Sequence, residues 1–159
     1  FAMTGWRLGY LGAPTKITKA CIKLQGQFTS GTCSITQRAA ISALLKKPDF
    51  TKEMKNKFFI RRNLTMNLLK NIEGIKVPEP KGAFYIFADF SYYFNKKYKQ
   101  KIIKNNDELS LFLLEEGEVA TVSGSAFGDN NCIRISIASS EKDLKTAISR
   151  IKKCLSKLS

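Results

Sequence analysis

The chain has 159 residues, a formal net charge of +14 and a hydrophobic content of 43%, enough apolar material for a folded domain with a core. No apolar run reaches the roughly 18 residues that a membrane-spanning helix needs, and the start is not typical of a signal peptide. Four cysteines without CxxC spacing, and no histidine, predict reduced thiols in a cytoplasmic protein and no metal site. The chain opens inside an apolar segment without Met, which indicates a piece of a longer protein.

The positive charge comes mainly from lysine, because only six of the 27 basic residues are arginine. These lysines are spread over stretches with helical periodicity, and no RNP motif, zinc finger or Gly-Arg tract accompanies them. We therefore expect solvated helix faces and no nucleic-acid or membrane partner. A basic nucleic-acid-binding domain is kept as an alternative from a different functional class.

The first part of the chain is predicted to be mostly helical after one strand. Residues 7–13 alternate and end at Pro14, which predicts a strand followed by a helix with proline in its first turn. Apolar residues at helical spacing predict helices over 15–24 and 34–45. The polar, small residues 25–33 between them predict a loop.

A long helix is predicted next, introduced by Pro48 and Asp49 and extending to about Asn71. Its apolar residues recur at helix-like intervals, and basic residues fill the other face. A helix of this length would measure about 35 Å, enough to bridge two lobes.

The rest of the chain predicts an α+β lobe, because strands and helices follow one another from about residue 75. Strands are expected over 75–77 and 82–90, with a proline-marked turn between them. Residues 95–106 are expected to form a charged surface excursion. Asp107 is expected to cap a helix over 108–116, which ends at Gly117.

The last elements are two strands and a helix. Strands are predicted over 119–122 and 133–138, with a Gly/Ser turn over 123–130 between them. Ser140, followed three residues later by Asp143, predicts a capping box for a final helix to about residue 158.

Arg7 and Arg134 each lie in a short apolar frame that would otherwise predict a buried strand. A permanent charge among apolar neighbours needs an anionic partner, because burying it unpaired costs several kcal/mol. The planar guanidinium, with its five donors, suits a carboxylate or a phosphate. The two arginines therefore predict a site that holds two anions, unless each one only pairs with an internal carboxylate.

Five segments, which follow one another along the chain in the same order as in the family, resemble the class I aspartate aminotransferases. These are fold-type I pyridoxal-phosphate enzymes. Phe1–Tyr10 (FAMTGWRLGY) is similar to the stretch that follows the Schiff-base lysine, and Ile133–Ala138 (IRISIA) to the family's Ile-Arg-x-Ser-x-Ala. The segment PKGAFY is similar to Pro-x-Gly-Ala-Phe-Tyr. The remaining two are a Gln- and Ser/Thr-rich loop at 25–37 and the stretch 113–128, where Ser123 stands at a position usually held by proline.

This resemblance implies an α/β fold: the C-terminal part of a fold-type I transferase. It implies the end of the large cofactor-binding domain over 1–47, an interdomain helix over 48–74 and a small α+β domain over 75–159. The Schiff-base lysine would lie two residues before Phe1. The resemblance therefore implies that this chain holds no catalytic residue and is inactive alone.

The resemblance also implies roles for particular residues. Arg7 would bind the phosphate of pyridoxal 5'-phosphate, and Arg134 would bind the α-carboxylate of the substrate. Thr29 and Ser30 lie in a loop that approaches the phosphate in the family, although they could equally be turn residues before a helix. Phe127 would line the substrate pocket, or else belong to the core.

The activity implied for the whole protein is amino transfer from aspartate to 2-oxoglutarate by a cytoplasmic homodimer with shared active sites. Its partners would be amino-acid and 2-oxo-acid substrates. Aromatic- or alanine-type amino transfer within the same family stays open, because an arginine that binds the carboxylate common to all amino acids does not discriminate between side chains.

Overall fold

The computed structural model describes residues 1–46 and 49–159, which divide into an N-terminal unit, Phe1–Glu53, and a C-terminal unit, Met54–Ser159. The predicted boundary between residues 47 and 48, and the role of Pro48 in introducing a helix, lie outside the described residues. The division into a large-domain end, an interdomain helix and a small domain stays a prediction.

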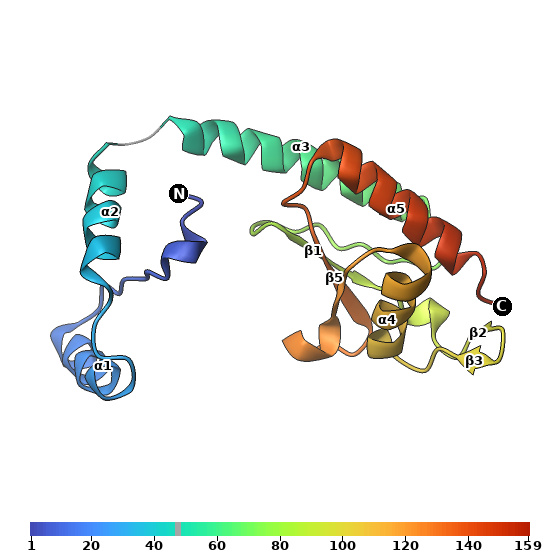
Figure 1. The fold of residues 1–159 in the computed structure, drawn as a ribbon, viewed down its shortest axis with the longest axis horizontal. Helices are drawn as coiled ribbons and strands as arrows, with labels where there is room; N and C mark the ends of the chain where they lie inside the picture. The colour runs from blue at the N-terminus through green and yellow to red at the C-terminus, as the bar shows by residue number, and fades with distance from the viewer. Residues whose placement is uncertain (47–48) are drawn as a thin grey trace. The chain divides into compact units, whose positions relative to one another are not determined.

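The N-terminal unit contains a 3-10 turn, Thr4–Trp6, and the helices α1, Thr15–Phe28, and α2, Ser34–Leu45 (Figure 1). The predicted bounds of α2 are confirmed. The loop predicted from residue 25 was wrong at its start, because α1 continues to Phe28. Glutamines are good helix formers, and they keep this last turn helical in spite of Gly26.

The strand predicted over residues 7–13 was wrong, because these residues form no regular element. A strand exists only when a neighbouring strand pairs with it, and no other part of the described chain pairs with this one. The alternating pattern of residues 7–13 favours a strand but does not show whether a partner strand is present.

The long helix α3, Phe50–Lys70, begins in the N-terminal unit and continues into the C-terminal one. The long helix predicted to about Asn71 is therefore confirmed in its described part. Thr65 is buried on this helix, and its hydroxyl donates to the carbonyl of Arg61 at 2.8 Å.

The C-terminal unit is built on an antiparallel sheet in the order β1-β5-β4 (Figure 1). Strand β1 is Tyr85–Asp89, β4 is Val122–Ser123 and β5 is Cys132–Ser136. In this register Arg134 pairs with Phe87 of β1 on one side and with Val122 of β4 on the other. The central strand β5 therefore places Arg134 between two neighbours.

Two helices, α4 (Asn106–Gly117) and α5 (Glu141–Leu155), contact each other in the C-terminal unit. Side chains from α3, α4, α5, β1 and β5 form one apolar core. Its fully buried members include Leu69, Ile86, Phe90, Ile103, Leu109, Leu113, Ile133, Ile137, Ile151 and Leu155.

The segment predicted as a charged excursion contains structure that the sequence did not suggest. A hairpin joins β2, Lys97–Tyr98, to β3, Lys101–Ile102. The amide and carbonyl of Lys97 also bond to Ser159, so the end of the chain pairs beside this hairpin. Ile103 follows the hairpin and is fully buried.

Four predicted strands were too long or displaced. The strand predicted over 133–138 is β5, which begins one residue earlier and ends at Ser136. Strand β1 starts only at Tyr85, because Ala83 has a left-handed φ of 61° that is incompatible with extended backbone. The strand predicted over 75–77 is reduced to one bridge, between Lys76 and Asp89. The strand predicted over 119–122 is displaced to β4, because the amide of Val119 bonds to the end of α4.

Helix ends followed local capping chemistry. Ser140 caps α5 as predicted: its Oγ accepts from the amide of Asp143 at 3.1 Å and donates to that carboxylate at 2.6 Å. The cap predicted at Asp107 was wrong, because Asn105 Oδ1 accepts the amide of Glu108 at 2.9 Å, and α4 starts at residue 106. Helix α5 ends at Leu155, three residues before its predicted end.

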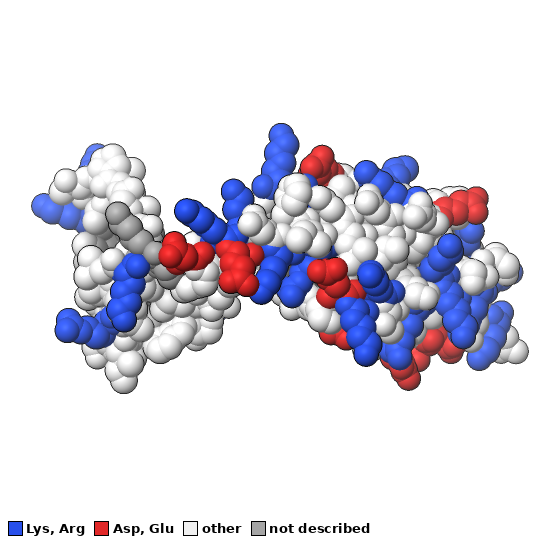
Figure 2. Space-filling view, turned by 90° about the horizontal axis from the view of Figure 1, so that it is seen from above, with Lys and Arg blue, Asp and Glu red and all other residues white. Residues whose placement is uncertain are grey.

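Charged side chains are mixed on the surface of the C-terminal unit. Figure 2 shows Lys and Arg interspersed with Asp and Glu on the visible face of this unit. One such group joins the hairpin, α4 and the turn that follows α5, because Glu116 accepts hydrogen bonds from Tyr98 Oη at 2.7 Å and from Lys157 Nζ at 3.2 Å.

Candidate functional site

Arg7 directly follows the 3-10 turn in the N-terminal unit and has a left-handed φ of 54°. Its Nη1 donates to the carbonyl of Thr4 at 3.2 Å, and the residue is exposed rather than buried as its apolar frame suggested. Among the described residues, no acidic side chain forms an ion pair with it. The guanidinium is therefore available to an anion from outside these residues.

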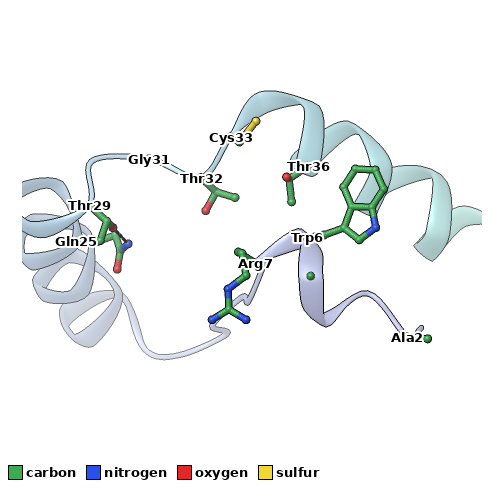
Figure 3. Close-up of a pocket in the computed structure, with 10 residues that line it drawn as sticks. Ala2, Trp6, Arg7, Gln25, Thr29, Gly31, Thr32, Cys33 and Thr36 are labelled. Carbon is green, nitrogen blue, oxygen red and sulfur yellow. Dashed lines mark hydrogen bonds between the residues drawn. The ribbon is translucent and has the colours of Figure 1, made fainter. Parts of the chain in front are cut away.

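A hollow of about 780 Å³ lies beside Arg7. Figure 3 shows Arg7 between the end of α1, with Gln25 on the helix and Thr29 directly after it, and the start of α2, with Cys33 directly before the helix and Thr36 on it. The Gln25 side-chain amide donates to the Thr29 hydroxyl. The wall of this hollow therefore combines a cation, hydroxyl groups and a side-chain amide.

Ser30 lines a neighbouring hollow of about 710 Å³, which Arg7 and Gln25 also line. Ser30 has a left-handed φ of 61°, at the point where the chain turns from α1 towards α2. The structure thus brings the predicted residues Arg7, Thr29 and Ser30 to two adjoining hollows. Their roles toward a cofactor stay predictions.

The start of α2 adds donors that the sequence reasoning missed. Cys33 occupies the N-cap, and backbone amides of Thr36 and Ile35 lower the pKa of its thiol. A helix N-terminus favours negative charge, because its first amides have no partner inside the helix. The signal that could have revealed this was the Ser/Thr-rich approach to the helix, with Thr32 and Thr36 on either side of Cys33.

Arg134 lies in the C-terminal unit, stacked between two aromatic rings. Its guanidinium carbon lies 4.2 Å from the ring centroid of Tyr85 and 4.1 Å from that of Phe127. Phe127 in turn contacts Phe87 edge-on, with centroids 6.4 Å apart. The two rings hold the guanidinium by cation–π attraction, and within residues 1–46 and 49–159 none of its N–H groups donates a hydrogen bond.

Nothing acidic in the described chain pairs with Arg134. Tyr85 was missed as a stacking partner, although it is the diagonal neighbour of Arg134 across the antiparallel pair β1–β5. Phe127 is 49% exposed, so it is not a core residue within this chain. A cation with two covered faces and a free edge can take a carboxylate in one plane.

Within residues 1–46 and 49–159, no group of three or more His, Cys, Asp or Glu side chains could hold a metal ion. No helix of these residues is both long and apolar enough to cross a membrane.

Residues 1–151 match the model of the family described as aminotransferase class I and II. The chain belongs to this family. It is 45% identical to the bifunctional aspartate aminotransferase and glutamate/aspartate-prephenate aminotransferase of Petunia hybrida, covering 98% of this chain and 33% of that protein. It is 42% identical to the aspartate aminotransferase of Rhizobium meliloti strain 1021, covering 100% of this chain and 39% of that one.

Solved aminotransferase structures share the fold. The crystal structure of the aspartate aminotransferase from Rhizobium meliloti superposes with a TM-score of 0.87 at 42% identity, covering 99% of this chain and 40% of that one. The aromatic aminotransferase from Pyrococcus horikoshii OT3 superposes with a TM-score of 0.81 at 33% identity, covering 98% and 40%. The predicted family and the fold-type I α/β class are confirmed, and the chain spans about a third to two-fifths of these relatives' length.

Proposed function

We propose that this aminotransferase-family chain is the C-terminal portion of a pyridoxal-phosphate-dependent enzyme that transfers the amino group of aspartate to 2-oxoglutarate. The observation that supports this most is the Arg134 guanidinium, which is stacked between two rings and free of any acidic partner in the described chain. Relatives named aspartate aminotransferases support the choice of donor. Aromatic substrates are the alternative, favoured by the 33% identity to the Pyrococcus aromatic aminotransferase.

Arg134 would bind the α-carboxylate of the substrate. Rings on both faces leave only the edge of the guanidinium open, so a carboxylate would bind in the plane with two parallel hydrogen bonds. Such a fork fixes the direction of the Cα–H bond as well as the position of the substrate. Phe127 would line the same pocket, because half of its surface is open.

Arg7, Thr29 and Ser30 would hold the cofactor phosphate. The residues fit this group, because threonine hydroxyls, the start of α2 and a guanidinium without an ion pair in the described chain surround the hollow. When bound, pyridoxal phosphate supplies the electron sink for the reaction. The residues of this chain bind and orient its phosphate and take no part in moving a proton.

We further propose that the 159 residues alone catalyse no amino transfer, because the lysine position of the family motif falls outside them. A cytoplasmic homodimer with shared active sites belongs to the same proposal.

The experiment is a steady-state assay of the longest product of the gene, comparing Arg134→Leu with Arg150→Leu. Arg150 is an exposed arginine paired with Glu118 at 3.0 Å and serves as a matched charge control. Arg134→Leu should lower kcat/KM about a hundredfold to a thousandfold with every amino-acid donor, as expected for the loss of a charged bidentate contact. Arg150→Leu should leave it unchanged. Equal effects of the two substitutions would overturn the role of Arg134.

A further inference from the structure

We propose that Asn106, at the start of α4, is a positioning residue for carboxylate recognition. It fixes the loop formed by residues 124–131, which carries Phe127, and Phe127 in turn fixes the plane of the Arg134 guanidinium. This inference rests on the proposed function of Arg134.

Asn106 is the buried polar anchor of this loop. It is 1% exposed, and its Nδ2 donates to the carbonyls of Asp129 and Cys132, both at 3.2 Å. These two carbonyls lie 23 and 26 residues away in sequence, so the bonds join α4 to the approach of β5. A buried amide with two defined acceptors specifies a geometry that apolar packing would not.

The anchored loop has no room to adjust. A Cβ at Gly124 would lie 2.3 Å from the carbonyl oxygen of Cys132 and 2.4 Å from that of Asp129, the same two oxygens that Asn106 holds. The amide of Asp129 also donates to the Gly124 carbonyl at 3.1 Å. The loop is therefore closed tightly on itself at the point where Asn106 binds it.

A second contact from α4 holds the other side of the loop. Ser125 Oγ donates to Asp107 Oδ1 at 3.1 Å and lies 2.7 Å from the Ser123 hydroxyl. Helix α4 thus holds the loop both before Phe127, through Ser125, and after it, through Asp129.

These contacts of the loop are important because the Phe127 side chain is not buried, so burial alone does not fix its position. Half of its surface is exposed, yet its ring centroid lies 4.1 Å from the guanidinium carbon of Arg134. Tyr85 is fixed by the strand pairing of β1 with β5, whereas Phe127 depends on its loop. Loosening the loop would release one face of Arg134 and leave the other covered.

The first test is NMR on the 159-residue chain, following the contact between the Phe127 ring protons and the Nε–H of Arg134. Asn106→Ala should abolish this cross-peak and move the Arg134 Nε–H signal away from its ring-shifted position. Leu109→Val, a control one turn along α4 in the same core, should keep both. A folded Asn106→Ala chain that keeps the cross-peak would overturn the inference.

Ser125→Ala keeps the test decisive if Asn106→Ala does not fold. Ser125 is exposed, and its substitution removes the outer bond to Asp107 and the contact with the Ser123 hydroxyl, but keeps both bonds of Asn106. It should weaken the Phe127–Arg134 cross-peak while leaving the core signals in place. An unchanged cross-peak in this variant, with Asn106→Ala unfolded, would leave α4 with a purely structural role and overturn the proposal.

A second readout uses the longest product of the gene. Asn106→Ala should lower kcat/KM for the amino-acid donor about tenfold, because a guanidinium that can turn binds the carboxylate less tightly and orients the Cα–H bond less well. An unchanged kcat/KM would contradict the positioning role. If the NMR effect is present but the wild-type protein transfers no amino group, the proposed function fails while the loop mechanism stands.

Discussion

The two units of the chain differ in how they support their arginine. In the described part of the N-terminal unit only Thr36 and Ala40 are buried, and the Arg7 side chain makes one hydrogen bond, to the carbonyl of Thr4. In the C-terminal unit a large apolar core lies under the sheet that carries Arg134. The packed sheet fixes the position of Arg134, whereas the segment that carries Arg7 needs further structure to fix it.

Apolar side chains show the same difference. Ile22, Phe28 and Leu45 of the N-terminal unit are 65%, 82% and 77% exposed. Helices of this length gain most of their stability from packing, so α1 and α2 cannot be strongly stabilised by the contacts within their own unit. The segment that carries Arg7 is therefore less autonomous than the sheet that carries Arg134.

The largest expected difference is in hydrogen exchange. In the 159-residue chain, the amides of β5 should exchange roughly a thousandfold more slowly than those of α1, because opening the core costs far more free energy than fraying an exposed helix. Exchange followed by mass spectrometry measures this ratio. Equal protection of β5 and α1 would contradict the claim that the C-terminal unit is the more firmly packed of the two.

Truncation of one isoleucine in each unit should show the difference in packing between the two units. Ile151→Ala, at a fully buried position of α5, should lower the free energy of unfolding by about 2–5 kcal/mol. Ile22→Ala, at an exposed position of α1, should change it by less than about 0.5 kcal/mol. Urea titration followed by circular dichroism checks both, and a large effect at Ile22 would show that α1 packs against something within the chain.

Alanine substitutions at two glycines should have opposite effects on stability. Gly124→Ala should destabilise the C-terminal unit by about 1–3 kcal/mol, because its Cβ would overlap two backbone oxygens. Gly26→Ala in α1 meets no atom within 4 Å and should favour that helix by up to about 1 kcal/mol. Thermal unfolding and helix content by circular dichroism measure the pair. A neutral Gly124→Ala would show that the loop is less tightly closed.

The smallest expected effect is an acid dependence at Asp89. Burial alone would raise the pKa of this carboxyl, but bonds from Ser91 and the charge of Lys76 outweigh it and hold the pKa below its ordinary 3.8. The resulting stability is present above pH 3.8 and is lost as pH falls toward the lower folded pKa.

Denaturant titrations across the acid range compare wild type with Asp89→Asn, which lacks this carboxyl. The wild type should lose more stability than the variant as the pH falls below 3.8. Parallel pH profiles would contradict the assignment to Asp89.

Local signals in the sequence predicted the helices best. The bounds of α2 and the Ser140–Asp143 cap of α5 depend on neighbouring residues alone, and both are confirmed. The strand expected over 7–13 and the β2–β3 hairpin were misjudged, because a strand is defined by a partner elsewhere in the chain.

The residues of the candidate site likewise fall into those that local motifs predicted and those that only the structure reveals. Arg7 and Arg134 were found from their motifs, and the family resemblance they carried is confirmed. The stacking of Tyr85 and the anchoring by Asn106 join residues tens of positions apart, so no local pattern reveals them. Register and loop closure had to be seen in the structure.

The most direct test of the proposed aminotransferase site is the absorbance spectrum of the longest product of the gene, mixed with pyridoxal phosphate and then with aspartate. We expect a bound-cofactor band in the visible range that shifts when aspartate is added. A product that binds no cofactor, or a bound band that does not respond to aspartate or any other amino acid, would contradict the assignment of Arg7 and Arg134 to an aminotransferase site.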